Sequence, residues 1–186
     1  MHLEAPEPVA EALRSHFSGQ DPCTPGGDPW ALDIRLVVFD VDGVWTDGSL
    51  DYGPDGERKR FNVRDGLAVK LLRKAGIEVA LLSGRRSEAV ERRAVELGVA
   101  HRLLGIDNKL PALKALLKQL QVEPPQVAYM GDDRIDLEAM AEVGLAVAPA
   151  DAVPEVLAVA DWTTAAKGGH GAVREFVERL LGVVDR

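Results

Sequence analysis

Two aspartates, Asp40 and Asp42, follow directly after a short apolar and β-branched run, Leu36–Phe39. Such a run is typical of a buried parallel strand, and an open α/β sheet binds its ligands at the carboxyl ends of its strands. Two carboxylates this close repel each other unless a cation or a proton lies between them. The pattern therefore predicts a charged functional site at the end of a strand.

Polar residues follow three other apolar runs in the same way. They are Ser83-Gly84-Arg85, then Lys109 at the start of a helix, then Gly131-Asp132-Asp133 with Asp136 one turn later. Three acids with no histidine or thiolate beside them favour a hard cation such as Mg²⁺, which shares its coordination with phosphate. A serine hydroxyl, backbone N–H groups and a lysine are suited to hold phosphoryl oxygens. Together these groups predict phosphoryl transfer.

The elements between these residues predict the sheet that would bring them together. From Ile34 onward, short apolar runs alternate with segments of helical period, which indicates an α/β fold with a Rossmann-like parallel sheet and helices on both faces. We expect strands at Leu36–Phe39, Val79–Leu82, Ala100–Leu103, Val127–Met130 and Leu145–Val147, and helices at about Leu67–Ala75, Ser87–Leu97, Lys109–Leu120 and Ile135–Glu142.

One segment interrupts the alternation. Ser49–Tyr52 and Arg58–Val63 flank Gly53-Pro54-Asp55-Gly56, which is typical of a β-hairpin with Pro-Asp-Gly at its turn. The hairpin is expected to project from the carboxyl edge of the sheet beside the two aspartates. A small lid or an oligomer contact is its natural use.

The first 33 residues differ from the rest. Pro6–Ser18 could form a short amphipathic helix, and the segment from Gln20 to Pro29 is rich in turn residues. We therefore expect residues 1–33 to be an N-terminal extension, in part disordered, and residues 34–186 to form one domain.

Composition narrows the functional classes. With 28% charged residues, 46% hydrophobic residues and a net charge of −8, the chain is typical of a globular protein and lacks the basic face that nucleic-acid binding requires. Cys23 is the only cysteine, which excludes an internal disulfide or a thiolate zinc site and favours a reducing compartment. No segment has the roughly 20 apolar residues of a membrane span. The N-terminal segment also lacks the apolar core of a signal peptide. We expect a cytoplasmic protein that binds neither nucleic acid nor membrane.

The four groups resemble the motifs of the haloacid dehalogenase superfamily of aspartate-nucleophile phosphatases, in the order that the family has them. They are Asp40-Val41-Asp42-Gly43-Val44-Trp45-Thr46, then Ser83, then Lys109, then Gly131-Asp132-Asp133-Arg134-Ile135-Asp136.

The resemblance implies a role for each residue. Asp40 would be the nucleophile that takes the phosphoryl group, and Asp42 the acid that protonates the leaving oxygen and later the base that activates water. Mg²⁺ would be bound by the Asp40 carboxylate, the Asp42 main-chain carbonyl and Asp132. Ser83, Gly84 and Lys109 would hold the phosphoryl oxygens, and Asp133 would orient Lys109, with Asp136 as a further supporting residue.

Within the superfamily, the chain has no room for a large cap domain, and its hairpin lies where the smallest caps occur. Asn62-Val63-Arg64-Asp65-Gly66, Ser83-Gly84-Arg85 and the segment Gly168–Glu175 look like those of the 3-deoxy-D-manno-octulosonate 8-phosphate phosphatases, and more loosely like the nonulosonate 9-phosphate phosphatases. This implies a homotetramer in lipopolysaccharide biosynthesis that acts on a small sugar-acid phosphate. Arg85 suits the sugar carboxylate, and Arg64 and Arg93 are further substrate-binding candidates. The octulosonate is the expected substrate, and the nonulosonate is the alternative.

Other interpretations remain beside these. A calcium loop would need glycine and a bidentate acid where Trp45 and Asp51 stand, so it is disfavoured. Ser83 could cap a helix, Asp133 and Asp136 could be first-turn acids, and Arg93 could serve in pairing along its helix. A further alternative for the whole chain is a non-catalytic oligomeric binding module, which the intact set of four groups disfavours.

Overall fold

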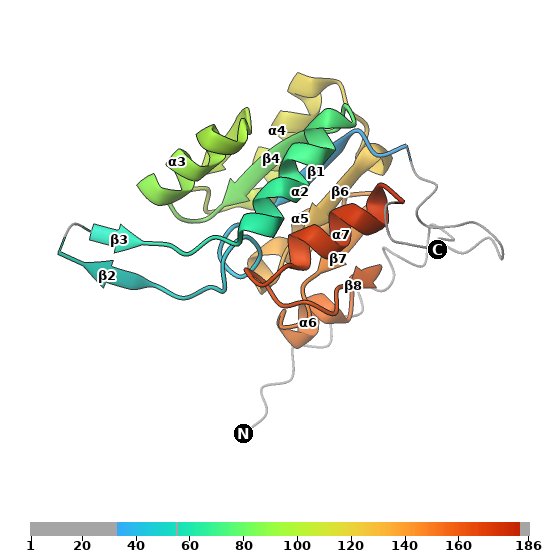
Figure 1. Ribbon diagram of the computed structural model, residues 1–186. Coiled ribbons are helices and arrows are strands. Elements are labelled where there is room, and N and C mark those ends of the chain that lie inside the picture. The colour runs from blue at the N-terminus through green and yellow to red at the C-terminus, as the bar shows by residue number, and fades with distance from the viewer. Residues whose placement is uncertain (1–32, 55, 183–186) are drawn as a thin grey trace.

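A six-stranded parallel sheet forms the centre of the computed structural model, which describes residues 33–54 and 56–182 (Figure 1). The strand order is β5-β4-β1-β6-β7-β8, and every adjacent pair is parallel. The strands are β1 (Leu36–Phe39), β4 (Glu78–Ser83), β5 (His101–Leu104), β6 (Val127–Met130), β7 (Leu145–Ala148) and β8 (Trp162–Thr163). The predicted Rossmann-like sheet is confirmed, and β8 is an addition that the sequence did not suggest.

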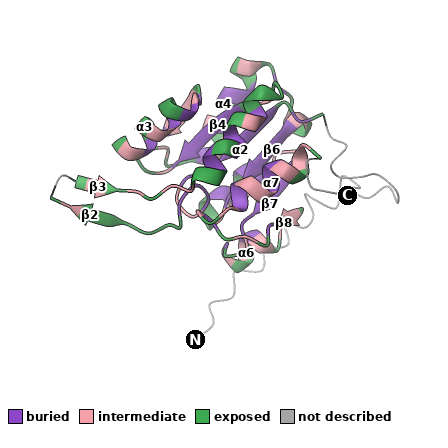
Figure 2. Ribbon diagram, in the orientation of Figure 1, coloured by how far each residue is buried: buried purple, intermediate pink, exposed green. Residues whose placement is uncertain are grey.

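Helices cover both faces of this sheet, as predicted. Along β1, Val37 and Phe39 pack into one core with α2 (Val63–Lys74), α3 (Glu88–Leu97) and α7 (Ala172–Leu180). Leu36 and Val38 point the other way, into a core with α4 (Lys109–Leu120), α5 (Leu137–Met140) and α6 (Pro154–Leu157). Figure 2 shows the buried strands between the two helical layers. Because β1 is buried on both faces, its functional groups can lie only at its carboxyl end.

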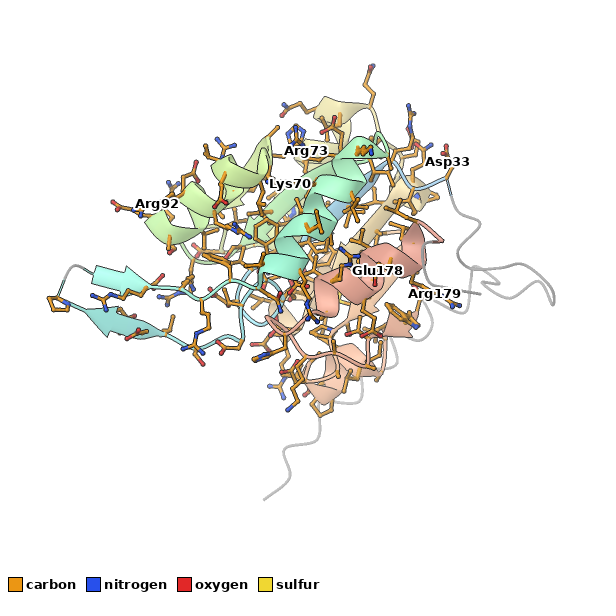
Figure 3. All side chains as sticks on the ribbon, in the orientation of Figure 1. Asp33, Lys70, Arg73, Arg92, Glu178 and Arg179 are labelled. Carbon is orange, nitrogen blue, oxygen red and sulfur yellow. The ribbon has the colours of Figure 1, made fainter. Side chains whose placement is uncertain are left out.

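Charged side chains lie on the outer sides of the helices. Figure 3 labels Lys70 and Arg73 on α2 and Arg92 on α3, all three of which are exposed. Arg73 also donates a hydrogen bond from Nη1 to the Leu97 carbonyl oxygen at 3.0 Å, which ties α2 to the end of α3. In the described part of the chain, no helix is long and apolar enough to cross a membrane.

The hairpin consists of β2 (Asp51–Gly53) and β3 (Gly56–Arg58), which pair antiparallel and project from the body of the molecule (Figure 1). Its strands are shorter than predicted. Asn62 is extended and accepts a hydrogen bond from the Arg64 N–H at 2.8 Å, so it caps α2 and the helix begins at Val63. The expectations of a strand to Val63 and of a helix starting at Leu67 were therefore wrong. Asp55, in the predicted turn, lies outside the described residues.

Other boundaries also differ. The segment predicted as one helix from Ile135 to Glu142 is a short 3₁₀ helix, η2 (Arg134–Asp136), followed by α5. The helices α6 and α7 were not predicted. The helix expected at Pro6–Ser18, the linker after it and nearly all of the predicted extension lie outside the described residues.

Candidate active site

The four predicted groups meet at one edge of the sheet. Asp40 and Asp42 follow β1, Ser83 ends β4, Lys109 begins α4, and Asp132 follows β6. The strand order places β1 between β4 and β6, and the chain reverses its direction of winding there. Open α/β sheets bind ligands at this switch point, in the crevice beyond the carboxyl ends of the strands.

Lys109 connects two carboxylates inside this edge. Its Nζ lies 2.7 Å from Asp40 Oδ1 and 2.6 Å from Asp136 Oδ1, and only 2% of the residue is exposed. Burial by itself lowers the pKa of Lys109, but the two carboxylates outweigh it and raise that pKa above its ordinary value. The ammonium is therefore a fixed positive charge beside Asp40, and not the solvated surface lysine of the alternative interpretation.

Asp136 is the residue that orients Lys109. Its Oδ1 also accepts a hydrogen bond from the Tyr129 hydroxyl at 2.7 Å, and its Oδ2 accepts from the N–H groups of Asp132 and Asp133 at 3.1 and 3.2 Å. The carboxylate of Asp133 is exposed and instead accepts from the Arg134 N–H at 2.7 Å, as the cap of η2. The expectation that Asp133 orients Lys109 was wrong, because the 3₁₀ turn directs Asp136 inward and Asp133 outward.

Asp40, Asp132 and Asp136 form an acidic group in which one oxygen of each lies within 4.8 Å of the others. Burial, and then the neighbouring carboxylates, raise the pKa of both Asp40 and Asp132. The Oδ1 atom of Asp132 is buried and has no hydrogen-bond partner among the described residues. A buried, unpaired carboxylate oxygen beside a second carboxylate fits a hard cation.

The hydrogen bonds within the acidic group indicate which of its carboxylates could bind a metal ion. Both Asp136 oxygens are already engaged by hydrogen bonds, so Asp40 and Asp132 are the carboxylates that could hold Mg²⁺. Gly43 makes room for Asp132: it has a φ of +88°, and a Cβ there would lie 1.9 Å from Asp132 Oδ2. Only glycine combines this backbone conformation with such a close approach.

The carboxylate of Asp42 lies apart from the acidic group. Its Oδ1 accepts a hydrogen bond from the buried ammonium of Lys59 and one from Thr46 Oγ1 at 3.4 Å, and its Oδ2 lies 3.8 Å from Arg85 Nε. The two aspartates of the motif thus have different surroundings. The placement of the Asp42 main-chain carbonyl on a metal remains a prediction.

Two charged residues that the sequence did not single out contact the predicted site residues: Glu57 in β3, and Lys59 directly after that strand. Glu57 Oε2 lies 2.6 Å from Arg85 Nη2, and Lys59 contacts Asp42. The sequence Arg58-Lys59-Arg60 does not mark the middle residue, and the pattern indicates only that the hairpin is next to the aspartates.

Ser83 is buried, and its Oγ accepts a hydrogen bond from the Arg85 N–H at 3.3 Å. It does not cap a helix, because α3 begins at Glu88 with Ser87 as its N-cap residue. Ser83 and the neighbouring Gly84 therefore remain candidates for holding a phosphoryl group.

The two other predicted arginines lie elsewhere. Arg64 is exposed in the first turn of α2. Arg93 pairs with Glu96 at 2.9 Å, three residues along α3, and a Cβ on Gly66 would lie 2.2 Å from its Nη2. Within the described chain, neither is ion-paired to the acidic group, and their roles in substrate binding remain predictions.

A glycine-rich segment near the C-terminus packs against the loop that follows Asp42. The Gly169 N–H donates to the Val44 carbonyl oxygen at 3.0 Å, and a Cβ on Gly168 would lie 1.7 Å from the Gly43 carbonyl oxygen. Asp65 of α2 accepts hydrogen bonds from the Gly171 and Arg174 N–H groups at 3.2 and 2.8 Å. The segment thus packs against and holds the loop that follows Asp42 in its own chain.

Comparisons with known proteins give similarity over most of the chain. A profile of the haloacid dehalogenase-like hydrolases matches residues 104–176. A 3-deoxy-D-manno-octulosonate 8-phosphate phosphatase of Yersinia pestis is 48% identical, over 84% of this chain and 84% of the relative.

Solved structures agree with this similarity. The crystal structure of a phosphatase of that description from Yersinia pestis has a TM-score of 0.79 and 49% identity, and the match covers 82% of this chain and 83% of that one. The corresponding protein of Moraxella catarrhalis, in complex with a magnesium ion, a phosphate ion and a KDO molecule, has a TM-score of 0.80 and 43% identity, with 82% and 88% covered.

Proposed function

This chain belongs to the haloacid dehalogenase-like hydrolases, in the family of the 3-deoxy-D-manno-octulosonate 8-phosphate phosphatases, and we propose that it hydrolyses that sugar-acid phosphate with Mg²⁺ as its cofactor. The products are the free sugar acid, a lipopolysaccharide precursor, and inorganic phosphate. The observation that carries the proposal is the buried Lys109 ammonium between Asp40 and Asp136, beside an Asp132 oxygen that has no hydrogen-bond partner among the described residues. This arrangement offers one carboxylate as nucleophile and positive charge to receive a phosphoryl group.

In the first step, an Asp40 carboxylate oxygen attacks phosphorus, and the bond from phosphorus to the sugar oxygen breaks. Asp42 gives its proton to that oxygen, so the sugar leaves as an alcohol. Lys109 and Ser83 hold the phosphoryl oxygens, and Asp136 keeps the ammonium of Lys109 in place. Asp40, Asp132 and the Asp42 main-chain carbonyl would hold Mg²⁺, which when bound would neutralise the charge that otherwise repels the attacking carboxylate.

In the second step, a water oxygen attacks the phosphorus of the aspartyl-phosphate. Asp42 takes the proton of the water, the bond from phosphorus to the Asp40 oxygen breaks, and phosphate leaves. Asp42 therefore ends with the proton that the next first step requires. Its position outside the acidic group suits this proton transfer.

Arg85 is the proposed contact for the carboxylate of the sugar acid. Its side chain is 46% exposed and is paired with Glu57, so a substrate carboxylate would have to replace Glu57 on the guanidinium. A guanidinium can hold a carboxylate by two parallel hydrogen bonds.

A substrate panel tests the proposal. With Mg²⁺, kcat/KM is expected to be highest for the octulosonate 8-phosphate, lower for a nonulosonate 9-phosphate and lowest for a sugar phosphate without a carboxylate, with no turnover after chelation. Arg85→Ala is expected to raise KM for the sugar acid by roughly 10- to 100-fold and to leave p-nitrophenyl phosphate hydrolysis nearly unchanged.

Arg86→Ala is the matched control, because Arg86 is the exposed neighbour of Arg85. A higher kcat/KM for the nonulosonate would transfer the assignment to the alternative substrate. No turnover of any ester in Mg²⁺ would support the non-catalytic binding module.

We also propose that the chain forms a homotetramer. Apolar side chains are exposed on the hairpin and at the start of α2, namely Leu50 (44%), Tyr52 (68%), Val63 (79%) and Leu67 (50%). Exposed apolar surface of this kind is typical of an interface, and a two-stranded hairpin alone is too small to exclude water from a site. Light scattering is expected to give a mass four times the 20.0 kDa of one chain, and a fully active monomer would contradict the assembly.

A further inference from the structure

Four charged side chains form a closed ring of alternating sign at the base of the hairpin. Lys59 contacts Asp42 Oδ1, Asp42 Oδ2 lies 3.8 Å from Arg85 Nε, Arg85 Nη2 lies 2.6 Å from Glu57 Oε2, and Glu57 Oε1 lies 3.7 Å from Lys59 Nζ. Three separate parts of the chain contribute: the loop after β1, the loop after β4, and the hairpin. The ring therefore ties the hairpin to the proposed proton-transfer group.

Burial differs around this ring. The side chain of Lys59 is 0% exposed, whereas those of Glu57, Asp42 and Arg85 are 17%, 22% and 46% exposed. Solvent screens the Arg85 contacts, and a long exposed side chain is free to move. The buried Lys59 ammonium has no water to replace its carboxylate partner. The ammonium and the carboxylate therefore hold each other in place.

Lys59 and Thr46 both engage Oδ1 of Asp42. In the described structure Oδ2 accepts no hydrogen bond within 3.5 Å, because its neighbour Arg85 is 3.8 Å away. This leaves Oδ2 as the oxygen that can exchange a proton, while Oδ1 anchors the carboxylate.

We propose that Lys59 is a positioning residue, which holds Asp42 by Oδ1 so that Oδ2 can take the proton of the attacking water. The proposal rests on the proposed function, in which Asp42 is that base. In this proposal the hairpin segment helps to position a residue of the active site of its own chain, in addition to any contact with another chain. Lys59 does not react: in the step that it supports, the water oxygen bonds to phosphorus, the proton passes to Asp42, and the electrons of the breaking bond return to Asp40.

The two steps can be separated with p-nitrophenyl phosphate. Its leaving group departs as a stable anion and needs no proton, so only the hydrolysis of the aspartyl-phosphate depends on Asp42. With Lys59→Met we expect a rapid burst approaching one p-nitrophenolate per subunit, followed by a steady rate about 10- to 100-fold below that of the unchanged protein. Lys59→Arg, which keeps the charge, is expected to recover part of the steady rate. A general loss of structure would lower the burst and the steady rate together.

Asp42→Asn and Lys70→Met are the controls, since Lys70 is an exposed lysine on α2 (Figure 3). Asp42→Asn should give the same burst, and Lys70→Met should match the unchanged protein. A burst with Asp42→Asn but none with Lys59→Met, at an unaltered steady rate, overturns the role of Lys59. No burst and no loss with Asp42→Asn overturns the proposed function instead. If Lys59→Met does not fold, as circular dichroism would show, Lys59→Gln is subject to the same two outcomes.

Discussion

Asp40→Asn is expected to abolish turnover, with kcat lower by on the order of 10⁴-fold or more, while the protein stays folded. An amide is a far weaker nucleophile than a carboxylate, so no aspartyl-phosphate can form. The asparagine oxygen can still accept the hydrogen bond that Lys109 donates to Asp40 at 2.7 Å. The substitution also removes one of three neighbouring acids, of which Asp40 and Asp136 are buried and Asp132 is half-buried, so we expect the metal-free stability to be equal or slightly higher.

Two measurements check this expectation. Phosphate release from the octulosonate 8-phosphate gives kcat, and acid quenching with a radiolabelled phosphate ester reveals the covalent intermediate, which should be absent in Asp40→Asn. The matched control is Asp133→Asn, because the exposed Asp133 contacts only the start of η2 in the described hydrogen bonds. If Asp40→Asn kept turnover within tenfold of the unchanged protein, a covalent role for Asp40 would be wrong.

Most of the sheet could be predicted from the sequence because β1, β4, β6 and β7 each contain a continuous apolar run. The bounds of β1 and β6 agree with the prediction to the residue. β8 has only two residues, Trp162 and Thr163, and its place is set by hydrogen bonds to its neighbour β7 rather than by its own pattern. The start of α2 was missed because Asn62 was assigned to a strand, although its side chain is a good helix cap.

The site also contains residues that the sequence could place and residues that it could not. Each of four site residues lies at an end of a regular element or just after one, so topology alone brings them together: Asp40, Ser83, Lys109 and Asp132. Whether Asp133 or Asp136 contacts Lys109 depends on a single 3₁₀ turn, η2. The sequence Arg134-Ile135-Asp136 does not predict which of the two carboxylates this turn directs inward. Glu57 lies in the hairpin and Lys59 directly after it, and the orientation of this segment relative to the sheet comes from tertiary contacts. The sequence therefore predicted which residues meet at this edge of the sheet, but not the side chains with which they form hydrogen bonds and ion pairs.

Lys109→Met is expected to have the largest effect on stability. Methionine has nearly the same length and no charge, so Asp40 and Asp136 would lose the ammonium that lies 2.7 and 2.6 Å from them. Removing one partner of a buried ion pair typically costs about 3–5 kcal/mol of the free energy of unfolding. Because small domains have only about 5–15 kcal/mol in total, urea titration of the metal-free protein should show a much lower midpoint, and turnover should be lost.

The free energy of unfolding that Lys109→Met loses is expected to depend on pH. Burial and neighbouring acids already hold the pKa values of Asp40 and Asp132 above those of an unfolded chain. The Lys109 ammonium opposes this rise at Asp40, so its loss raises the pKa of Asp40 further. An acid whose pKa is higher in the folded state costs stability as the pH rises from its unfolded to its folded pKa. The deficit of Lys109→Met should therefore be larger at pH 8 than at pH 5.5.

The double variant Lys109→Met/Asp136→Asn separates charge from shape. It removes one of the stranded anions, so it should recover part of the lost free energy of unfolding but none of the turnover, since phosphoryl binding still lacks its cation. Lys114→Met is the control: this exposed lysine pairs with Glu142 at 3.0 Å, and surface pairs contribute about 0–1 kcal/mol. An unchanged urea midpoint for Lys109→Met at pH 8 would mean that the acids hold protons in place of the lysine charge, and that the ion pair does not stabilise the fold.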